Sequence, residues 1–292
     1  MLRIALPNKG RLAAETRALF ADAGLEVRTA GDRALTASLG EEFRALFVRA
    51  QDVPEFVADG AADAGVTGWD LIAESGRSLD TLLDLEFGRC RMVVAARDDT
   101  GIATVEDLAT ARAPHRVATV FPRLTRQFFA ECGGPVEVIA VSGAVEVAPH
   151  LGIADLIVDL TSTGSTLTVN GLHEIGTVLE SSARLITAPR ETSALTSPQR
   201  AALEELATAL SSVLRARSQR YLMANVPRAA LEQVKAILPG LRGPTVTDVL
   251  NGGSFVAVHA VVPGAGVYRT IAALKALGGE GILVTRIERL TP

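Results

Sequence analysis

The stretch 155-DLIVDLTSTGSTLTVNGL-172 changes character part-way and shows the unit from which the chain is built. Residues 155–159 form a short apolar run rich in β-branched side chains, which predicts a buried strand. A polar turn follows, and residues 165–170 are predicted to form a short helix. A buried strand that passes through a turn into a helix is typical of α/β folds.

The same alternation runs from residue 2 to about residue 188. Strands are predicted at residues 2–6, 43–49, 63–66, 91–96, 116–120, 136–141 and 155–159, and strand-like residues return at 176–186. Helices are predicted between them at residues 11–23, 53–59, 69–74, 105–109, 123–131, 144–151 and 165–170. This pattern indicates α/β units around largely parallel sheets.

A polar break at residues 97–101 indicates two lobes, the second inserted between parts of the first. Residues 1–96 and 176–218 are assigned to the first lobe, which ends in a long linker helix starting at Ser197-Pro198. Residues 97–175 are assigned to the second lobe. Ligands of open parallel sheets bind at the carboxyl ends of strands, so the cleft between the lobes is the expected site.

A different pattern follows the linker helix. Strands are predicted at residues 221–225, 245–250, 255–262 and 282–288, with helices at 228–238 and 267–277. This βαββαβ order predicts a ferredoxin-like domain over residues 219–292. Such domains often act as small-molecule sensors or oligomerisation modules, although the fold alone establishes neither role.

Composition narrows the class of protein. The 292 residues carry a net charge of −4 with a pI near 5.7, which argues against a globally basic nucleic-acid-binding protein. Three of the 29 basic residues are lysines and the rest are arginines, which suit forked contacts with phosphate. Cys90 and Cys132 suggest neither a disulfide framework nor a metal cluster. With no apolar run long enough for a secretory signal or a membrane span, a soluble cytoplasmic protein is expected.

The turn after the strand at 155–159 is suited to phosphate. Its backbone N–H groups lie at a helix N-terminus, its hydroxyls donate without adding charge, and Gly164 can adopt backbone angles closed to other residues. Asp159 would repel phosphate but can accept hydrogen bonds from sugar hydroxyls or hold a metal. A phosphorylated sugar satisfies both, while an ordinary loop capped by Thr163 is the alternative. The predicted contacts are Asp159, Thr161, Ser162, Thr163, Gly164, Ser165 and Thr166.

Basic residues follow other strands at the sheet edge where this turn should emerge. Lys9 and Arg11 come directly after the first strand. Because cations are disfavoured at a helix N-terminus, their position favours a ligand role over that of solvated charges. Arg49 ends another strand and is a further candidate phosphate contact, with a surface ion pair as the alternative. The sequence shows no histidine spacing typical of metal ligands, no nucleophile elbow and no P-loop motif.

With these residues, the chain resembles the long form of the ATP phosphoribosyltransferase family over essentially all of its length. The most specific part is a signature with every spacing kept. Its positions are Glu146, Gly152, Ala154, Ile157, Asp159, Leu160, Thr163, Gly164, Thr166 and Leu167. The opening Leu6 to Leu12 and the segment from Asp52 to Asp70 are also similar to the family's.

The resemblance implies a two-lobed, periplasmic-binding-protein-like catalytic part and a C-terminal ACT-type regulatory domain. It implies transfer of the 5-phosphoribosyl group from phosphoribosyl pyrophosphate to N1 of ATP, with Mg²⁺ carried mainly by the substrates. The turn Thr163 to Thr166 would hold the ribose 5-phosphate and Asp159 the ribose hydroxyls. The implied catalytic residues are Lys9, Arg11 and Asp159, and the implied ATP contacts are Arg49, Asp70 and Glu146.

The resemblance also implies regulation through the tail. Histidine would inhibit by favouring a compact homo-hexamer over an active homo-dimer, and AMP would be a further ligand. Positions that match the effector pocket are Asn225, Leu241 and Thr245. At Asn225 the family's pattern has a carboxylate.

Two other functions stay open on the residues alone. A non-catalytic two-lobed solute-binding protein would use the same kind of cleft, although the missing export signal counts against it. In the second alternative, the chain is an oligomeric signal protein. Its tail senses a nucleotide or an amino acid, and the two lobes serve as a scaffold.

Overall fold

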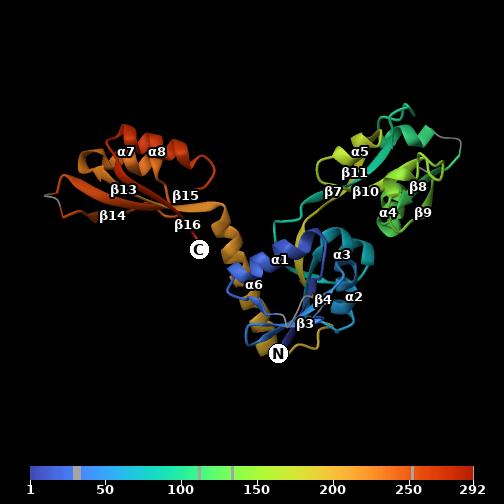
Figure 1. Ribbon diagram of the computed structural model, residues 1–292, viewed down its shortest axis with the longest axis horizontal. Coiled ribbons are helices and arrows are strands. Elements are labelled where there is room, and N and C mark those ends of the chain that lie inside the picture. The colour runs from blue at the N-terminus through green and yellow to red at the C-terminus, as the bar shows by residue number, and fades with distance from the viewer. Residues whose placement is uncertain (29–33, 111–112, 133–134, 251–252, 292) are drawn as a thin grey trace. The chain divides into compact units, whose positions relative to one another are not determined.

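The computed structural model describes residues 1–28, 34–110, 113–132, 135–250 and 253–291. The chain divides into two compact units, Met1–Ala207 and Thr208–Pro292 (Figure 1). Within the described residues, the first unit holds a seven-stranded and a five-stranded sheet, and the second unit a four-stranded sheet. The prediction of a two-lobed α/β part followed by a ferredoxin-like domain is confirmed.

The first sheet carries three parallel strands at its centre. β1 pairs in parallel with β4 on one side and β5 on the other, and antiparallel strands extend both edges. In spatial order the strands are β2 (Val27–Arg28), β3 (Thr36–Leu39), β4 (Phe43–Val48), β1 (Leu2–Pro7), β5 (Ala64–Gly68), β12 (Ala183–Thr187) and β6 (Asp80–Asp84). The helices of this lobe are α1 (Arg11–Asp22), α2 (Val53–Ala58) and α3 (Trp69–Ser75), with a 3-10 turn, η1 (Ala50–Asp52), before α2. Val53 and Val57 of α2 pack with Ala5 of β1 in one buried cluster, which fixes α2 against the sheet.

The second sheet surrounds the strand that the sequence singled out. Its order is β11 (Leu172–Ser181), β7 (Cys90–Arg97), β10 (Leu156–Thr161), β8 (His115–Thr119) and β9 (Val136–Ala140). Its other elements are α4 (Pro122–Cys132), α5 (Ser165–Val169) and the 3-10 turns η2 (Val105–Thr110) and η3 (Val145–Val147). β10 is central, and Leu156 and Val158 face one buried cluster while Ile157 faces another. A strand buried on both faces must be apolar throughout, which explains its continuous apolar run.

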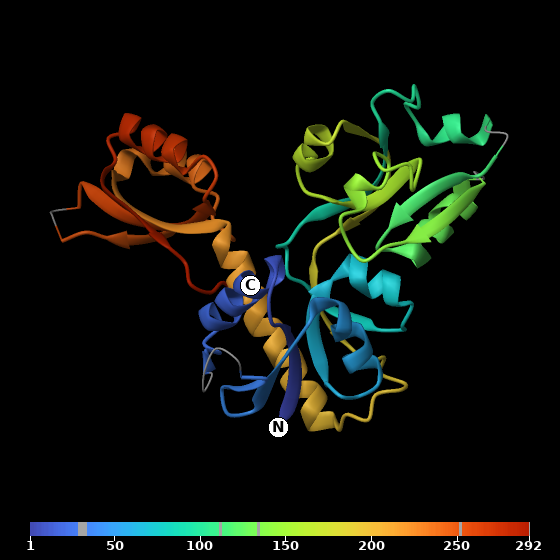
Figure 2. The ribbon, with the colours of Figure 1, turned by 45° about the vertical axis from the view of Figure 1, so that its right-hand side comes forward.

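The lobe boundaries assigned from sequence need a correction. Residues 90–97 form β7 of the second sheet, although residues up to 96 were assigned to the first lobe. The run at 176–186 is two strands, because β11 pairs with β7 whereas β12 pairs with β5 of the first sheet. β7 and β11 lie side by side as one edge of the second sheet and carry the chain into and out of this lobe (Figure 2). An apolar run shows that a strand is buried but not which sheet it joins, and so the boundary shifted by several residues.

Other sequence predictions also differ in detail. The predicted helix at 144–151 contains only the short turn η3, because Ala144 has a left-handed backbone with φ 50° and Pro149 cannot occupy a helix interior. The predicted helix at 105–109 is the 3-10 turn η2. The strands β2, β3 and β6 were not predicted. They extend the edges of the first sheet.

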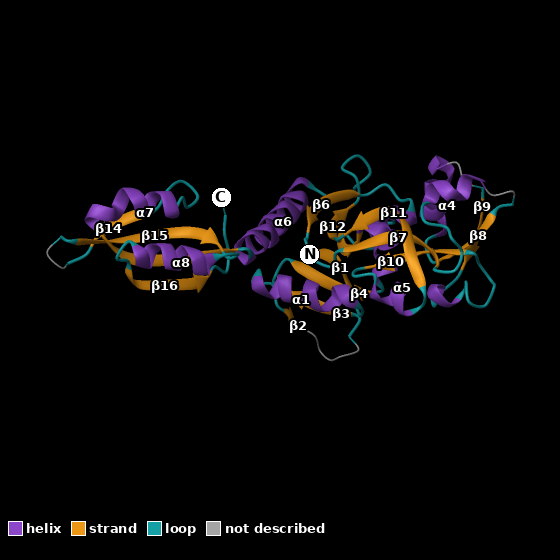
Figure 3. Cartoon of the chain, turned by 90° about the horizontal axis from the view of Figure 1, so that it is seen from above, coloured by secondary structure: helices purple, strands orange, loops and turns teal. Residues whose placement is uncertain are grey.

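The second unit has the βαββαβ order. Its sheet order is β14 (Thr245–Asp248), β15 (Phe255–Pro263), β13 (Gln219–Pro227) and β16 (Glu280–Arg286), with η4 (Arg228–Ala230), α7 (Leu231–Ile237) and α8 (Val267–Ala276). Leu222, Ala224 and Val226 alternate as buried residues along β13 and join Val234 of α7 and Leu274 of α8 in one core. Both helices therefore cover one face of the sheet (Figure 3). The helix α6 (Ser197–Arg217) crosses the boundary between the units.

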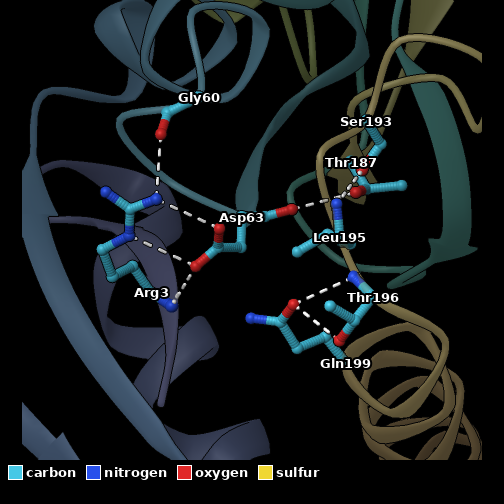
Figure 4. A network of polar contacts seen from close by, with 8 residues as sticks. All are labelled: Arg3, Gly60, Asp63, Thr187, Ser193, Leu195, Thr196 and Gln199. Carbon is cyan, nitrogen blue, oxygen red and sulfur yellow. Dashed lines mark hydrogen bonds and ion pairs between the residues drawn. The ribbon is translucent and has the colours of Figure 1, made fainter.

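The amino-terminal ends of β1 and β5 are joined by a structural network (Figure 4). Arg3 donates to the carboxylate of Asp63, with an Nη2–Oδ1 distance of 3.1 Å, and to the carbonyl of Gly60 at 2.9 Å. Thr187 of β12 donates to the Asp63 carbonyl at 2.9 Å. These polar groups are hydrogen-bonded to one another. Ligands of such sheets bind at the opposite end, where the carboxyl ends of the strands lie. Among the described residues, no helix has the length and apolar character needed to cross a membrane.

Candidate active site

The turn after β10 presents a ring of hydroxyls around one glycine. The hydroxyl of Thr161 accepts a hydrogen bond from the Gly164 N–H at 2.8 Å, which closes the turn. Gly164 has φ 78°, and the hydroxyls of Thr163 and Ser165 lie 2.9 Å apart. The exposed residues of the turn are Ser162, Thr163, Ser165 and Thr166. Because α5 has five residues, its dipole is small, and the hydroxyls and amides of the turn itself supply the donors for an anion.

Asp159 lies at the other end of this turn in a half-buried position on β10. Its Oδ1 accepts a hydrogen bond from the Leu160 N–H at 2.8 Å. Burial raises the pKa of the Asp159 carboxyl above its ordinary value, and the negative charge of Glu146 raises it further. The hydrogen bond from the Leu160 N–H opposes this rise only in part.

The predicted basic residues lie at the carboxyl ends of β1 and β4. The Asn8 N–H donates to the Val48 carbonyl at 2.8 Å, so the residues that follow the two strands are neighbours. The side chains of Lys9 and Arg49 are both exposed at this edge. Between Lys9 and Arg11, Gly10 has φ 87° and ψ −174°, a backbone conformation essentially restricted to glycine.

Arg11 is held by one backbone carbonyl and one carboxylate. One guanidinium nitrogen donates to the Gly88 carbonyl at 2.7 Å, and the other lies 3.9 Å from Oδ1 of Asp70. That same oxygen accepts a 2.5 Å hydrogen bond from the Ser181 hydroxyl, while the Asp70 N–H donates to Ser181 Oγ at 3.1 Å. Asp70 comes from α3 and Ser181 from the end of β11, so these bonds tie the two lobes together.

Asp70 therefore lies behind the site surface. It is 1% exposed, and its carboxylate is covered by Ser181 and Arg11. Sequence reasoning assigned Asp70 to ATP. In this structure its contacts are with protein groups, the Ser181 hydroxyl and the Arg11 guanidinium.

The neighbouring thiol is buried too. Burial raises the pKa of Cys90, although the Arg11 guanidinium nearby partly opposes this. The neutral thiol form of Cys90 is therefore favoured at neutral pH.

A cavity of about 340 Å³ lies beside Cys90 and the turn after β10. We call it the arginine cavity, and it is lined in part by Arg89, Arg91, Arg184, Ser162, Ser181 and Ser182. Among these, sequence reasoning had selected only Ser162. The others could have been found, because hydroxyl and charged residues interrupt the apolar runs at 90–97 and 176–186.

The predicted effector residues lie in the second unit. Asn225 is half-buried on β13, opposite Ala257 of β15, and Thr245 of β14 is opposite His259 of β15. Opposed residues share a face, so Asn225 and Thr245 both lie on the face that is not covered by α7 and α8. Leu241 is 61% exposed in the segment before β14.

Comparisons with known proteins agree with this arrangement. The profile of the family described as ATP phosphoribosyltransferase matches residues 49–212, and that of the HisG C-terminal domain matches residues 216–289. The chain belongs to the ATP phosphoribosyltransferase family. An ATP phosphoribosyltransferase of Gemmatimonas aurantiaca is 67% identical, and one of Natronomonas pharaonis 48%, each with both chains covered completely.

A solved structure supports the same assignment. It is titled as the ATP phosphoribosyl transferase (HisG:HisZ) complex from Thermotoga maritima and is 28% identical, with a TM-score of 0.63. The match covers 99% of that chain but 74% of this one. The recognition of the family from its signature residues is confirmed. The individual site assignments stay predictions.

Proposed function

We propose that the chain transfers the 5-phosphoribosyl group of phosphoribosyl pyrophosphate to N1 of the adenine of ATP, the first step of histidine biosynthesis. The observation that carries this proposal is the turn after β10, where exposed hydroxyls surround Gly164 and a carboxylate stands at one end. Ribose 5-phosphate offers a phosphate for the hydroxyls and sugar hydroxyls for Asp159. The family and the full-length relatives support the same reaction.

The reaction asks for alignment and charge stabilisation more than for proton transfer. The lone pair of adenine N1 attacks the anomeric carbon, the new C–N bond forms, and the bond to pyrophosphate breaks with its electron pair leaving on oxygen. The attacking nitrogen carries no proton, so no strong general base is required. Arg11, Lys9 and Arg49 are exposed basic groups at one sheet edge and can stabilise the departing negative charge.

Mg²⁺ fits this site as part of a metal–substrate complex. Within the described residues, no group of three or more His, Cys, Asp or Glu side chains gathers as a metal site. Asp159 and Glu146 are the interacting carboxylates near the turn and could contribute one or two ligands. Mg²⁺ commonly takes one or two carboxylates together with substrate phosphates and water. When bound, it would neutralise the polyphosphate and polarise the leaving group.

Regulation and assembly are part of the proposal. Histidine as inhibitor would bind the second unit near Asn225, Leu241 and Thr245, and AMP would compete as a nucleotide. The chain would form homo-dimers and hexamers in the cytoplasm, with no nucleic acid or membrane partner. The match of residues 216–289 to the HisG C-terminal domain and the βαββαβ order of the second unit support this regulatory role.

Incubation with ATP, phosphoribosyl pyrophosphate and Mg²⁺ tests the reaction directly. We expect equimolar pyrophosphate and N1-(5-phosphoribosyl)-ATP, identified by mass spectrometry. Asp159→Ala and a Lys9→Ala/Arg11→Ala double variant should each lose activity while staying folded. Binding of either substrate without product would favour the solute-binding alternative. Full activity in both variants would contradict the assigned site.

A further inference from the structure

The arginine cavity gathers charged side chains that lie outside the turn after β10. Its three guanidinium groups come from separate positions: Arg89 before β7, Arg91 within β7 and Arg184 on β12. We propose that this cavity is the subsite for the polyphosphate chain of a substrate. The proposal rests on the proposed function and assigns the polyphosphate of one substrate to this cavity.

The lining selects for a charged group over a nucleobase. Six of its side chains are the arginines and serines already named, and Asp84 and Glu180 are also polar. Cys90 is the one apolar side chain among the lining residues that the structure describes. Adenine sites need apolar or aromatic faces to cover the ring, and this lining does not supply them. Guanidinium forks and hydroxyl donors are instead the groups that recognise phosphate oxygens.

Arg184 carries a buried donor that lacks a partner. Its Nη1 is paired with Oδ2 of Asp84 at 2.8 Å, but its buried Nε–H meets no acceptor within the described part of the chain. A buried donor that makes no hydrogen bond is unfavourable, and most such groups in proteins find a partner. A phosphate in the cavity would supply that acceptor once the guanidinium turns to expose the Nε–H.

The charges of the lining leave one arginine available. Asp84 is engaged by Arg184, by the Ser182 hydroxyl at 2.9 Å and by the Glu86 N–H at 2.9 Å. Arg91 is paired with Glu174, with a nitrogen–oxygen distance of 2.5 Å. Arg89 is exposed and donates to the Glu86 carbonyl at 3.2 Å, with no carboxylate partner among the described residues. A ligand can therefore bind Arg89 without breaking an ion pair of that side chain. Glu180, which also lines the cavity, would repel an anionic ligand there.

Ser162 connects the cavity to the turn after β10. It lies between Thr161 and Thr163 of that turn and also lines the cavity. A polyphosphate in the cavity would therefore continue from the proposed ribose site. Two substrates could supply it: the pyrophosphate of phosphoribosyl pyrophosphate, or the triphosphate of ATP.

Calorimetry on the full-length chain with Arg89→Ala tests this and separates the two sources. ATP is compared with AMP, and phosphoribosyl pyrophosphate with ribose 5-phosphate, because each pair differs in its polyphosphate. Loss of one charged contact should weaken the polyphosphate member of a pair about tenfold and leave the other within about twofold. A loss confined to ATP assigns the triphosphate, and a loss confined to phosphoribosyl pyrophosphate assigns the pyrophosphate.

Two matched variants complete the experiment. Glu180→Gln removes the opposing charge and should strengthen binding of the same ligand severalfold. Arg126→Ala makes the same charge change on α4 and should leave all four affinities unchanged. Equal losses for both members of each pair, or no loss for any ligand in folded Arg89→Ala, would overturn the proposal. Because binding is measured without turnover, this result is independent of whether the transferase assay succeeds.

Discussion

The pairing of Asp70 with Ser181 is one of the contacts that join the lobes, and it lies beside Arg11. A carboxylate that is 1% exposed needs hydrogen bonds, and Ser181 both donates to it and accepts from its backbone. The arrangement also places Asp70 where it can hold the Arg11 guanidinium. Stability and activity should therefore change together at this position.

Ser181→Ala tests this coupling. The free energy of unfolding should fall by about 1–3 kcal/mol, because a buried carboxylate loses a hydrogen bond. The kcat should also fall, since Arg11 loses part of its support, and both can be measured by urea unfolding and the pyrophosphate assay. Ser212→Ala also removes a buried hydroxyl, which donates to the Ala209 carbonyl in α6, but should leave kcat unchanged. An unchanged kcat in Ser181→Ala would show that the pair is structural only.

Asp159 should make stability depend on pH in an unusual direction. Its pKa is raised from 3.8 in the folded chain, first by burial and then by Glu146, so the folded state keeps this proton where the unfolded state has lost it. The contribution of Asp159 to the free energy of unfolding therefore falls as pH rises from 3.8 through the folded pKa, and stays low above it.

Asp159→Asn should remove that penalty. The variant should be more stable than the parent chain at neutral pH, with the difference vanishing below about pH 3, where both side chains are neutral. Glu146→Gln should recover a smaller part of the gain. Urea unfolding at a series of pH values measures both. A variant less stable than the parent at neutral pH would contradict the raised pKa.

At this scale, the sequence pointed to the exposed residues of the turn after β10 but not to the buried contacts behind the candidate site. Asp159 and the turn residues were predictable because they directly follow one apolar run. Asp70 looked like a surface contact at the end of a strand, and its burial depends on Ser181, which is 111 residues away in sequence. A local pattern does not show that kind of contact.

At the scale of elements, the turns at Gly10 and Gly164 determine the course of the backbone after β1 and after β10. Gly164 has a left-handed backbone with ψ −7°, whereas Gly10 combines φ 87° with ψ −174°. No described atom lies within 4 Å of an added Cβ at either position. Any cost of substitution therefore comes from the backbone alone.

Alanine substitutions at the two glycines should distinguish these backbone conformations by their cost in unfolding free energy. Gly164→Ala should cost about 1 kcal/mol of unfolding free energy, and Gly10→Ala about 1–3 kcal/mol. Asparagine tolerates the left-handed region, so Gly164→Asn should recover most of the loss whereas Gly10→Asn should not. Urea unfolding gives the energies, and calorimetry with phosphoribosyl pyrophosphate shows whether the turn geometry is kept. Equal recovery by asparagine at both sites would contradict the assignment.

The strands were predictable to the extent that each is a separate apolar run. β1, β4, β5 and β10 could all be recognised, because their buried faces leave a continuous apolar signal. The division into lobes was predicted less accurately. β7 and β11 belong to the second sheet because they pair with each other, and this pairing joins residues that are far apart in sequence. The same pairing brings Cys90, Arg91, Glu180 and Ser181 to the arginine cavity, and none of these four was predicted from sequence as a site residue.

At the scale of the whole molecule, the residues proposed for the reaction and those proposed for regulation fall in different units. Lys9 to Thr166 lie in Met1–Ala207, and Asn225 to Thr245 in Thr208–Pro292. The Thermotoga maritima chain matches 74% of this one over nearly its full length, so a family member can lack a counterpart to the remainder. A chain cut after Arg217, where α6 ends, should keep the transferase reaction and lose inhibition by histidine.

Asn225→Asp gives the sharpest test of the effector assignment. The resemblance implies a carboxylate at this position to meet the amine of histidine, and a charged partner in place of the amide should strengthen that contact about tenfold. Histidine titrations of the transferase rate would show a lower inhibitory concentration for the variant, with kcat unchanged in the absence of histidine. Thr247→Asp places the same charge on the same sheet face, opposite Ala257, and serves as the control. If both variants gain sensitivity equally, the effect is one of general charge, and Asn225 does not contact the effector.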